Sequence, residues 1–344
     1  MADGIFVSYA QNGEDVLLWR ALGHVRNGRY VDVGAWDAVE HSVTKAFYDR
    51  GWRGVNVEPV PELAESIRQA RPADLVVQAA VTSDEAAELV LHRVHQPGAE
   101  RDVTGLSTLV ADVAARHAVD DRFVVDDITV PTVTLSALFE SELLGDTVHF
   151  LKVDVEGAEA DVLGSIDFSR HRPWVVVVEA TEPLSTEPSH EPWEGLLLGA
   201  GYEFAIFDGL SRYYVAAEQS EVKRALSYPV CVFDEYTTAR EIRQGEELAG
   251  IRAAHAEAID RGRELWEDVV HWRGVALESW AQGFKERERL TNRLKVVKER
   301  NADRNLAHKK KVRELRDRID RIEHSSSWRV TRPLRWARSK ASSR

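Results

Sequence analysis

The stretch YVDVGA, at Tyr30–Ala35, decides the fold expected for this chain of 344 residues. The run Tyr30–Val33 has the length and apolar character of a short buried strand. Gly34 follows it directly, and a glycine there lets the backbone come close to a ligand. In open α/β sheets, ligands bind at the carboxyl ends of the strands. The stretch therefore predicts a strand that ends in a binding loop, and the absence of a G-x-G-x-x-G run favours a nucleoside without a pyrophosphate.

Strand-like and helix-like patterns alternate on both sides of this stretch. Strands are expected at residues 54–58, 75–81, 148–154 and 174–179, with helices at 39–49, 61–71 and 158–164. Two more strands, 89–94 and 128–133, and a hairpin of 202–207 with 212–215 complete the pattern. Such alternation is typical of a parallel sheet with covered faces. The predicted fold class is α/β: a Rossmann-like, mostly parallel sheet with a terminal antiparallel hairpin and a helical C-terminal extension.

The ends of the first three strands carry residues suited to a nucleoside. Glu58 stands 26 positions after Asp32 at the end of the second strand, where a carboxylate can accept ribose hydroxyls. As an alternative, Glu58 is a helix N-terminal charge that the macrodipole stabilises. Gln78 and Ala79 end the third strand, where small residues leave room for an adenine ring. We therefore predict that these four residues and Gly34 bind the cofactor.

Carboxylates also follow the fourth and fifth strands. In an extended segment, Asp154 and Glu156 lie on one side, where they can bind a sulfonium cation, and Asp154 can act as a general base. Alternatively, the pair caps the helix that starts near residue 158. His41 is a second candidate base, or a structural hydrogen-bonding residue. Glu179 either orients the acceptor or caps a helix, so the predicted catalytic residues are Asp154, His41 and Glu179.

Several spaced motifs carry a family resemblance over roughly residues 8–215. They are QNGEDVLL at 11–18, HSVT at 41–44, FYDRGWRG at 47–54, NVEP at 56–59, GLSTL at 105–109 and KVDVEG at 152–157. In this order they resemble the FkbM family of S-adenosylmethionine-dependent O-methyltransferases. Trp36-Asp37-Ala38 departs from the Asn-x-Pro-like stretch of sugar-modifying relatives, so the resemblance leaves the shape of the acceptor pocket open.

The resemblance implies a class I methyltransferase fold, S-adenosyl-L-methionine as cofactor, and a sugar hydroxyl of a bacterial polysaccharide or glycoconjugate as acceptor. Two alternatives remain: a methyltransferase for a small metabolite such as a macrolide, and a non-catalytic scaffold that binds the donor in a glycan-assembly complex. No metal is expected. The single cysteine excludes Cys-x-x-Cys sites, and His92 and His95, three apart in a strand, point to opposite faces.

Charge divides the chain into an acidic body and a basic end. Residues 285–344 hold 21 Lys and Arg against 8 Asp and Glu, a net charge of +13, which leaves −25 on residues 1–284. An acidic body argues against a nucleic-acid partner. The expected domains are a methyltransferase domain at 1–235, a helical linker at 236–284, a short coiled coil at 285–323 and a basic Trp/Arg tail at 324–344. As an alternative to the coiled coil, 285–323 is a solvated charged helix.

The segment 325–336, SSSWRVTRPLRW, resembles a tail found on bacterial polysaccharide glycosyltransferases. It implies a glycosyltransferase partner, with self-association through the coiled coil as the alternative. Interleaved Trp and Arg can also lie on an anionic membrane surface, and a disordered tail is the remaining reading. No apolar run is long enough to span a bilayer, and no secretory signal is visible. The expected location is therefore the cytoplasm, with peripheral contact at the inner face of the plasma membrane as a further option.

Overall fold

The computed structural model describes residues 5–84, 86–98, 104–283 and 290–325, apart from some side chains near the turn between the last two helices. The chain forms two compact units, Met1–Ile242 and Arg243–Arg344. The segment 326–336 of the predicted basic tail lies outside the described residues. None of the helices in the described ranges combines the length and the apolar character needed to span a membrane.

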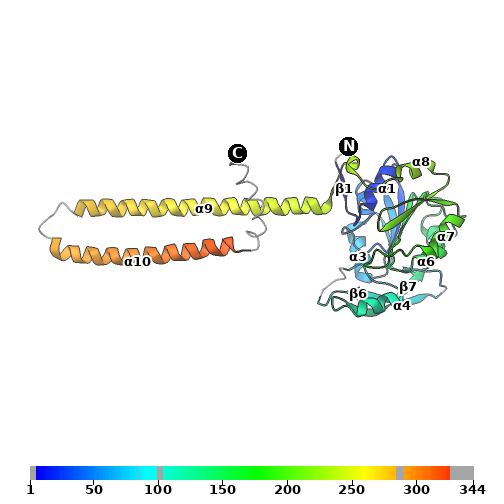
Figure 1. Cartoon of the computed structure of the whole chain (residues 1–344), viewed down its shortest axis with the longest axis horizontal. Helices are drawn as coiled ribbons and strands as arrows, with labels where there is room; N and C mark the ends of the chain where they lie inside the picture. The colour runs from blue at the N-terminus through cyan, green and yellow to red at the C-terminus, as the bar shows by residue number, and fades with distance from the viewer. Residues whose placement is uncertain (1–4, 85, 99–103, 284–289, 326–344) are drawn as a thin grey trace. The chain divides into compact units, whose positions relative to one another are not determined.

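A seven-stranded sheet forms the centre of the first unit (Figure 1). Its order is β10-β11-β9-β8-β2-β3-β4. The parallel strands are β2 (Arg29–Val33), β3 (Arg53–Val57), β4 (Leu75–Val77), β8 (Phe150–Val153) and β9 (Val175–Glu179), and the antiparallel ones are β10 (Tyr202–Phe207) and β11 (Ser211–Ala216). Successive crossovers run to opposite sides of β2, so β2 lies at the topological switch point. The predicted Rossmann-like sheet with a terminal hairpin is confirmed.

Helices cover both faces of this sheet because side chains alternate along each strand. Val31 and Leu151 belong to one apolar cluster, whereas their neighbours Tyr30 and Phe150 belong to the cluster on the opposite face. Strands buried on both sides read as near-continuous apolar runs, as the sequence does here. The helices of this unit are α1 (Glu14–Leu22), α2 (Lys45–Asp49), α3 (Pro61–Ala70), α4 (Ala111–Ala118), α5 (Leu135–Glu142), α6 (Glu159–Gly164), α7 (Glu191–Gly199) and α8 (Ser220–Ala225).

A second, three-stranded sheet has the order β5-β7-β6, from β5 (Ala80–Val81), β7 (Val124–Val133) and β6 (Glu88–His95). The prediction of one strand over 75–81 is therefore wrong, because Ala80 and Val81 leave β4 and pair with Thr132 and Val133. On β6, His92 contacts Asp127 and His95 contacts Asp126 across the β6–β7 pair.

The helix expected over 39–49 is shorter than predicted. The Asp37 carboxylate accepts hydrogen bonds from the backbone N–H groups of Val39 and Glu40, both at 2.8 Å. His41 has a φ of 52°, which an α-helix cannot contain. Residues 39–44 therefore form a loop, and α2 starts only at Lys45.

The two ends of the first unit meet in a small parallel pair of β1 (Phe6–Ser8) and β12 (Tyr236–Thr238). The buried Asp15 carboxylate fastens this end, because it accepts hydrogen bonds from Ser8 Oγ at 2.6 Å and from the Tyr9 N–H at 2.7 Å. A short 3₁₀ turn, Val232–Asp234, precedes β12. The chain becomes helical at Ala239, after β12, and not from about Glu235 as the sequence suggested.

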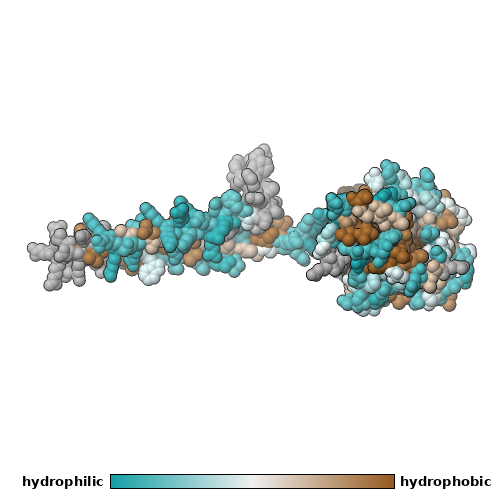
Figure 2. Space-filling model, turned by 90° about the horizontal axis from the view of Figure 1, so that it is seen from below, coloured by the Kyte–Doolittle hydropathy of each residue, from teal (hydrophilic) through white to brown (hydrophobic). Residues whose placement is uncertain are grey.

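The second unit contains most of α9 (Ala239–Gly283) and all of α10 (Leu290–Glu323). The two helices run antiparallel and side by side (Figure 1), and both line one groove. On the face of this unit that Figure 2 shows, hydrophilic side chains predominate, with separate hydrophobic positions among them. Trp266 and Trp272 on α9 are each 66% exposed. These helices therefore leave large apolar side chains uncovered.

Candidate functional site

A cavity opens at the carboxyl edge of the central sheet, where the loops after β2 and β8 touch. Gly34 has a φ of 76°, and a Cβ at this position would lie 1.7 Å from the carbonyl oxygen of Asp154. Only glycine allows this approach. Gly34 and Asp154 both line the cavity, so the sequence-predicted loop brings the ends of two neighbouring strands together there.

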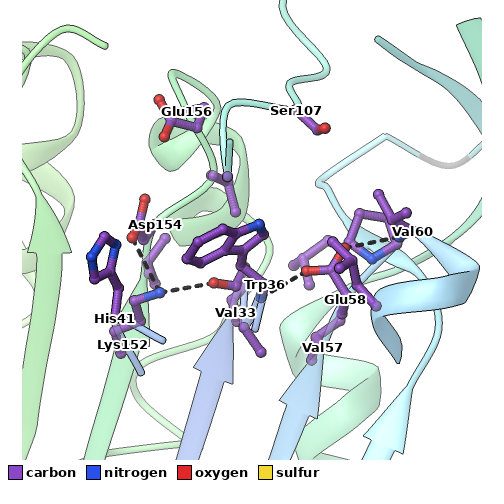
Figure 3. A pocket seen from close by; sticks show the side chains of 18 of the residues that line it. Val33, Trp36, His41, Val57, Glu58, Val60, Ser107, Lys152, Asp154 and Glu156 are labelled. Carbon is purple, nitrogen blue, oxygen red and sulfur yellow. Dashed lines mark hydrogen bonds and ion pairs between the residues drawn. The ribbon is translucent and has the colours of Figure 1, made fainter. Parts of the chain in front are cut away.

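One half of the cavity, on the β3 and β4 side, is built around Glu58. This side chain is 4% exposed and lines the cavity. Its Oε2 accepts the Trp36 N–H and its Oε1 accepts the Val60 N–H, both at 2.9 Å (Figure 3). These two backbone bonds fix the position of the carboxylate at the wall of the cavity.

Small and apolar side chains surround Glu58. Val60, Leu63, Ala79, Ala80 and Leu91 line this half. A flat apolar ring can fit between such walls, with Glu58 beside it. We call this part, Glu58 with these five residues, the β3–β4 half of the cavity.

Two residues predicted to bind the cofactor lie elsewhere. Asp32 does not line the cavity, because it is 1% exposed and accepts a hydrogen bond from Thr44 Oγ1 at 2.8 Å beneath the loop. Gln78 is half-buried and also outside the lining, although its neighbour Ala79 lines it. The structure thus gives Asp32 a supporting position below the site.

The other half, on the β8, β9 and β11 side, is acidic. Lys152 Nζ lies 3.2 Å from Asp154 Oδ2 and 3.4 Å from Asp32 Oδ1, and it donates to the Gly34 carbonyl oxygen at 2.8 Å. Burial alone would lower the pKa of Lys152, but Asp154 and Asp32 raise it above its ordinary value. Lys152 is therefore a permanent cation that ties the β2 loop to Asp154.

Three carboxylates gather beside this lysine. One oxygen each from Asp154, Glu156 and Glu179 lies within 4.8 Å of the others, a spacing at which they can share one cation. Burial raises the pKa of Glu156 and Glu179, and the neighbouring Asp154 raises both further. Asp154 and Glu156 line the cavity and Glu179 stands behind them. This group, which we call the carboxylate cluster, favours a positively charged group in front of it.

The predicted capping of α6 by Asp154 or Glu156 is not found. The N-cap position of α6 is Ala158, without a side-chain bond. Instead, the Glu159 carboxylate accepts the N–H groups of Gly157 at 3.1 Å and Val155 at 3.3 Å. Asp154 and Glu156 are thereby left facing the cavity.

Trp36 and His41 both line the cavity, with Trp36 between Glu58 and Asp154 and with His41 beside Asp154 and Lys152 (Figure 3). The centroids of the two rings lie 5.6 Å apart, and the His41 side chain is 47% exposed. The buried indole N–H of Trp36 finds no acceptor in the part of the chain that the structure describes. The local sequence did not single out Trp36 as a site residue, because only folding brings it over the sheet edge.

The sequence analysis also missed the contribution of the segment between β1 and α1. We call residues 9–14 the N-terminal loop; its last residue, Glu14, is also the first residue of α1. Gln11 and Glu14 line the cavity, and so do Leu210 and Ser211 at the start of β11. The Asn12 side chain donates to the Asp208 carbonyl oxygen at 3.1 Å, which joins the loop to the β10–β11 turn. The one available signal was the motif at 11–18, which matched the family resemblance without indicating a role.

Glu14 is the buried acid that this loop brings to the cavity. It is 4% exposed, and its Oε2 accepts the Asn12 N–H at 2.8 Å. Burial, with a further contribution from Asp208, raises the pKa of Glu14 to about 8. A carboxyl group with such a pKa can exchange a proton near neutral pH.

Comparisons with known proteins gave a family match and a similar solved structure. A profile described as the methyltransferase FkbM domain matches residues 32–204. A TehB-like SAM-dependent methyltransferase from Corynebacterium glutamicum, a solved structure, is similar over 59% of this chain and 87% of that chain, with 10% identity and a TM-score of 0.32. No curated protein matches the sequence significantly.

Proposed function

The chain belongs to the FkbM family of S-adenosylmethionine-dependent methyltransferases, and from this premise we propose that it methylates a sugar hydroxyl of a bacterial polysaccharide or glycoconjugate. The observation that carries the proposal is the division of one cavity into the β3–β4 half and an acidic half. The first suits a nucleoside, and the second suits a positive centre beside a hydroxylated acceptor.

The residues of the cavity fit the methyl donor S-adenosylmethionine. Glu58 can accept its ribose hydroxyls, and the apolar walls around Ala79 and Leu91 can hold its adenine. The carboxylate cluster can compensate its positive charges. When bound, this donor supplies a methyl group already activated on a sulfonium, so the protein's main task is to position an acceptor oxygen in line with it.

Three residues can act on the acceptor. Asp154 and His41 both line the cavity and are candidates for holding the hydroxyl proton. Asp154 is engaged in an ion pair with Lys152 Nζ at 3.2 Å, an arrangement that suits charge compensation better than proton uptake. Glu179, behind Asp154, can orient that carboxylate and with it the acceptor.

Donor binding is the first test. S-adenosylmethionine and S-adenosylhomocysteine are titrated calorimetrically into the full chain and into a Glu58→Ala variant. We expect binding by the full chain and weaker binding by the variant. Absence of binding by the full chain would overturn the proposed donor site.

Methyl transfer is the second test. The full chain is incubated with radiolabelled donor and a panel of free, nucleotide-linked and polymeric sugars, beside a macrolide. We expect label on a sugar. Label on the macrolide alone supports the small-metabolite alternative, and donor binding without transfer to any acceptor supports the scaffold.

We propose further that the α9–α10 unit joins the enzyme to a second copy of the chain. By sequence, α9 has a net charge of −3 and α10 a net charge of +6. In an antiparallel pair of such units, each acidic α9 can pack between two basic α10 helices, and Trp266 and Trp272 can be covered there. A glycosyltransferase partner, and membrane contact through the basic tail, are the rival outcomes.

Light scattering tests this pairing. We expect a dimer for the full chain and a monomer for the double variant Trp266→Glu with Trp272→Glu. A monomeric full chain at micromolar concentration contradicts self-association. Binding of the monomer to anionic vesicles, or to a glycosyltransferase, would then identify the rival.

A further inference from the structure

The N-terminal loop places a buried carboxyl group in the cavity on the side away from Glu58. Glu58 follows β3, to one side of β2, whereas Asp154 follows β8 and Ser211 begins β11, to the other side. Gln11 and Glu14 also line the cavity, and Asp208 in the β10–β11 turn acts on Glu14, which places Glu14 on this second side. A donor bound with its nucleoside at Glu58 therefore leaves this part of the cavity for the acceptor.

Two contacts determine where the loop lies, and one strand pairing places it relative to the carboxylate cluster. Ala10 forms a backbone bridge with His41, and the Asn12 side chain bonds to the Asp208 carbonyl oxygen. Ser211 is paired with Glu179 in the β11–β9 register. The loop thus spans from the His41 loop to the β10–β11 turn and crosses the edge of the sheet next to the carboxylate cluster.

The side chains brought together there suit several hydroxyl groups. Gln11 offers an amide donor and acceptor, Ser211 a hydroxyl, His41 an imidazole and Glu14 a carboxyl, and all four line the cavity. Leu210 adds an apolar surface beside them. Alternating donors and acceptors next to an apolar patch are the chemistry that recognises a polyhydroxylated ring.

We propose that Gln11 and Glu14 form the acceptor subsite for a polyhydroxylated ligand, a sugar, and that the Glu14 carboxylate takes the proton of the reacting hydroxyl. This inference rests on the proposed methyl transfer. The acceptor O–H bond breaks and its proton goes to a Glu14 oxygen. The acceptor oxygen forms a C–O bond to the methyl carbon with a lone pair, while the electron pair of the broken C–S bond leaves with the neutral thioether.

Glu14 suits this task better than its neighbours. Asp154 is paired with Lys152 at 3.2 Å, and the His41 ring is half exposed. Among the residues that the structure describes, Glu14 forms no ion pair: its Oε2 accepts the Asn12 N–H, and the nearby negative charge of Asp208 adds to the effect of burial on its pKa. A desolvated carboxylate without an ion pair is the stronger base.

The test compares the full chain with Glu14→Gln and with a control, Glu221→Gln. Glu221 lies in the first turn of α8, is exposed and pairs with Arg224. The substitution Glu221→Gln therefore makes the same chemical change outside the cavity. Each protein is titrated with S-adenosylhomocysteine and assayed for methyl transfer to a panel of methyl glycosides and nucleoside-diphosphate sugars. Gln11→Ala is measured in parallel.

We expect Glu14→Gln to bind S-adenosylhomocysteine within about twofold of the unmodified chain, and to lose about 10²–10⁴-fold in kcat/KM. In the unmodified chain kcat/KM should rise with pH through about 8, and this rise should be absent in Glu14→Gln. Gln11→Ala should raise KM for the sugar more than it lowers kcat. Glu221→Gln should behave like the unmodified chain.

The outcomes separate the two proposals. If the unmodified chain transfers no methyl group to any sugar of the panel, the proposed function fails and this inference falls with it. If it does transfer, and Glu14→Gln is equally active or keeps the rise with pH, the inference alone is overturned. Loss of S-adenosylhomocysteine binding in Glu14→Gln would also overturn it, because Glu14 would then serve the donor or the fold.

Discussion

The two halves of the cavity are built on different physical principles. In the β3–β4 half, one carboxylate is held by two backbone N–H groups and surrounded by apolar walls. In the acidic half, Lys152 pairs with Asp154, Asp154 clusters with Glu156 and Glu179, and Glu14 lines the same cavity. Burial raises the pKa of Glu14, Glu156 and Glu179. The first half combines a fixed carboxylate with apolar walls, as the proposed nucleoside site requires. The second has unbalanced charge, which suits a cation and a mobile proton.

The largest expected effect comes from removing the cation of the acidic half. Lys152→Met leaves the buried Asp32 and the partly exposed Asp154 without their ion-pair partner. Breaking the buried pair with Asp32 costs about 3–5 kcal/mol, and chemical unfolding at pH 7 measures this loss. Lys45→Met, which breaks an i,i+4 pair with Asp49 near the surface, should cost at most about 1 kcal/mol. Equal losses of unfolding free energy in Lys152→Met and Lys45→Met would show that the Lys152 pairs are no stronger than a surface pair.

The next effect concerns the β3–β4 half alone. Glu58→Gln removes a charged hydrogen-bond acceptor, worth about 1.5–3 kcal/mol. We expect S-adenosylmethionine and S-adenosylhomocysteine to lose affinity by about 10- to 100-fold, equally for both because they share the ribose. Calorimetry measures both. Glu62→Gln, at the start of α3 and paired with Arg93, is the control and should bind both ligands normally. Unequal losses would mean that Glu58 acts on the charged end of the donor.

A smaller effect separates the two ligands. Asp154→Asn weakens the charge of the carboxylate cluster, so S-adenosylmethionine, which carries the sulfonium, should lose more affinity than S-adenosylhomocysteine. The ratio of the two affinities should change by about tenfold, equivalent to about 1.4 kcal/mol. An unchanged ratio would show that the cluster does not face the sulfonium, and would direct attention to a metal ion bound there.

Glu14 should make stability depend on pH. Its pKa is raised to about 8 in the folded chain from an ordinary 4.5, so between these values the folded state binds more protons than the unfolded state. The stability of the unmodified chain therefore falls as pH rises through this window. Glu14→Gln lacks this loss, and its melting temperature relative to the unmodified chain should rise by a few degrees from pH 5 to pH 9. A constant difference over that range would mean that Glu14 is not desolvated.

The smallest effect is expected from the second unit. A chain ending at Ile242 keeps the whole first compact unit and every residue that lines the cavity. Its affinity for S-adenosylhomocysteine should stay within about twofold of that of the full chain. The reason is that free-energy changes at distant, independent sites add without affecting one another. A larger loss would show that α9 and α10 affect the cavity. Ligand binding would then not be independent of the unit proposed for self-association.

Sequence alone identified several residues that line the cavity. Gly34 and Glu58 follow short apolar runs directly, and Asp154 follows another, so local pattern is enough to place them at strand ends. The family resemblance rested on the same stretches and agrees with the profile match. Strand ends are predictable because the pattern that makes a parallel strand is local, and all carboxyl ends of parallel strands meet at one edge.

Long-range contacts decided the rest. Asp32 and Lys152 are paired in the β2–β8 register, and with Thr44 beneath the loop this turns Asp32 away from the cavity. Likewise, the sequence places Gln78 and Ala79 inside one strand over 75–81. In the structure, the chain leaves β4 there, and the next strand, β5, pairs with β7. No periodicity within a segment encodes which distant strand it joins, because that choice depends on packing between segments.

What the sequence determined by itself is the α/β sheet, the binding loop at Gly34 and the carboxylates at the strand ends, since each follows from neighbouring residues. Only the tertiary structure brought Glu14, 140 positions before Asp154 in the chain, to the same cavity, and buried it there. The physical reason is that burial and charge balance belong to surroundings assembled from distant segments. A glutamate in a polar motif becomes a candidate base only after the fold has removed the water around it.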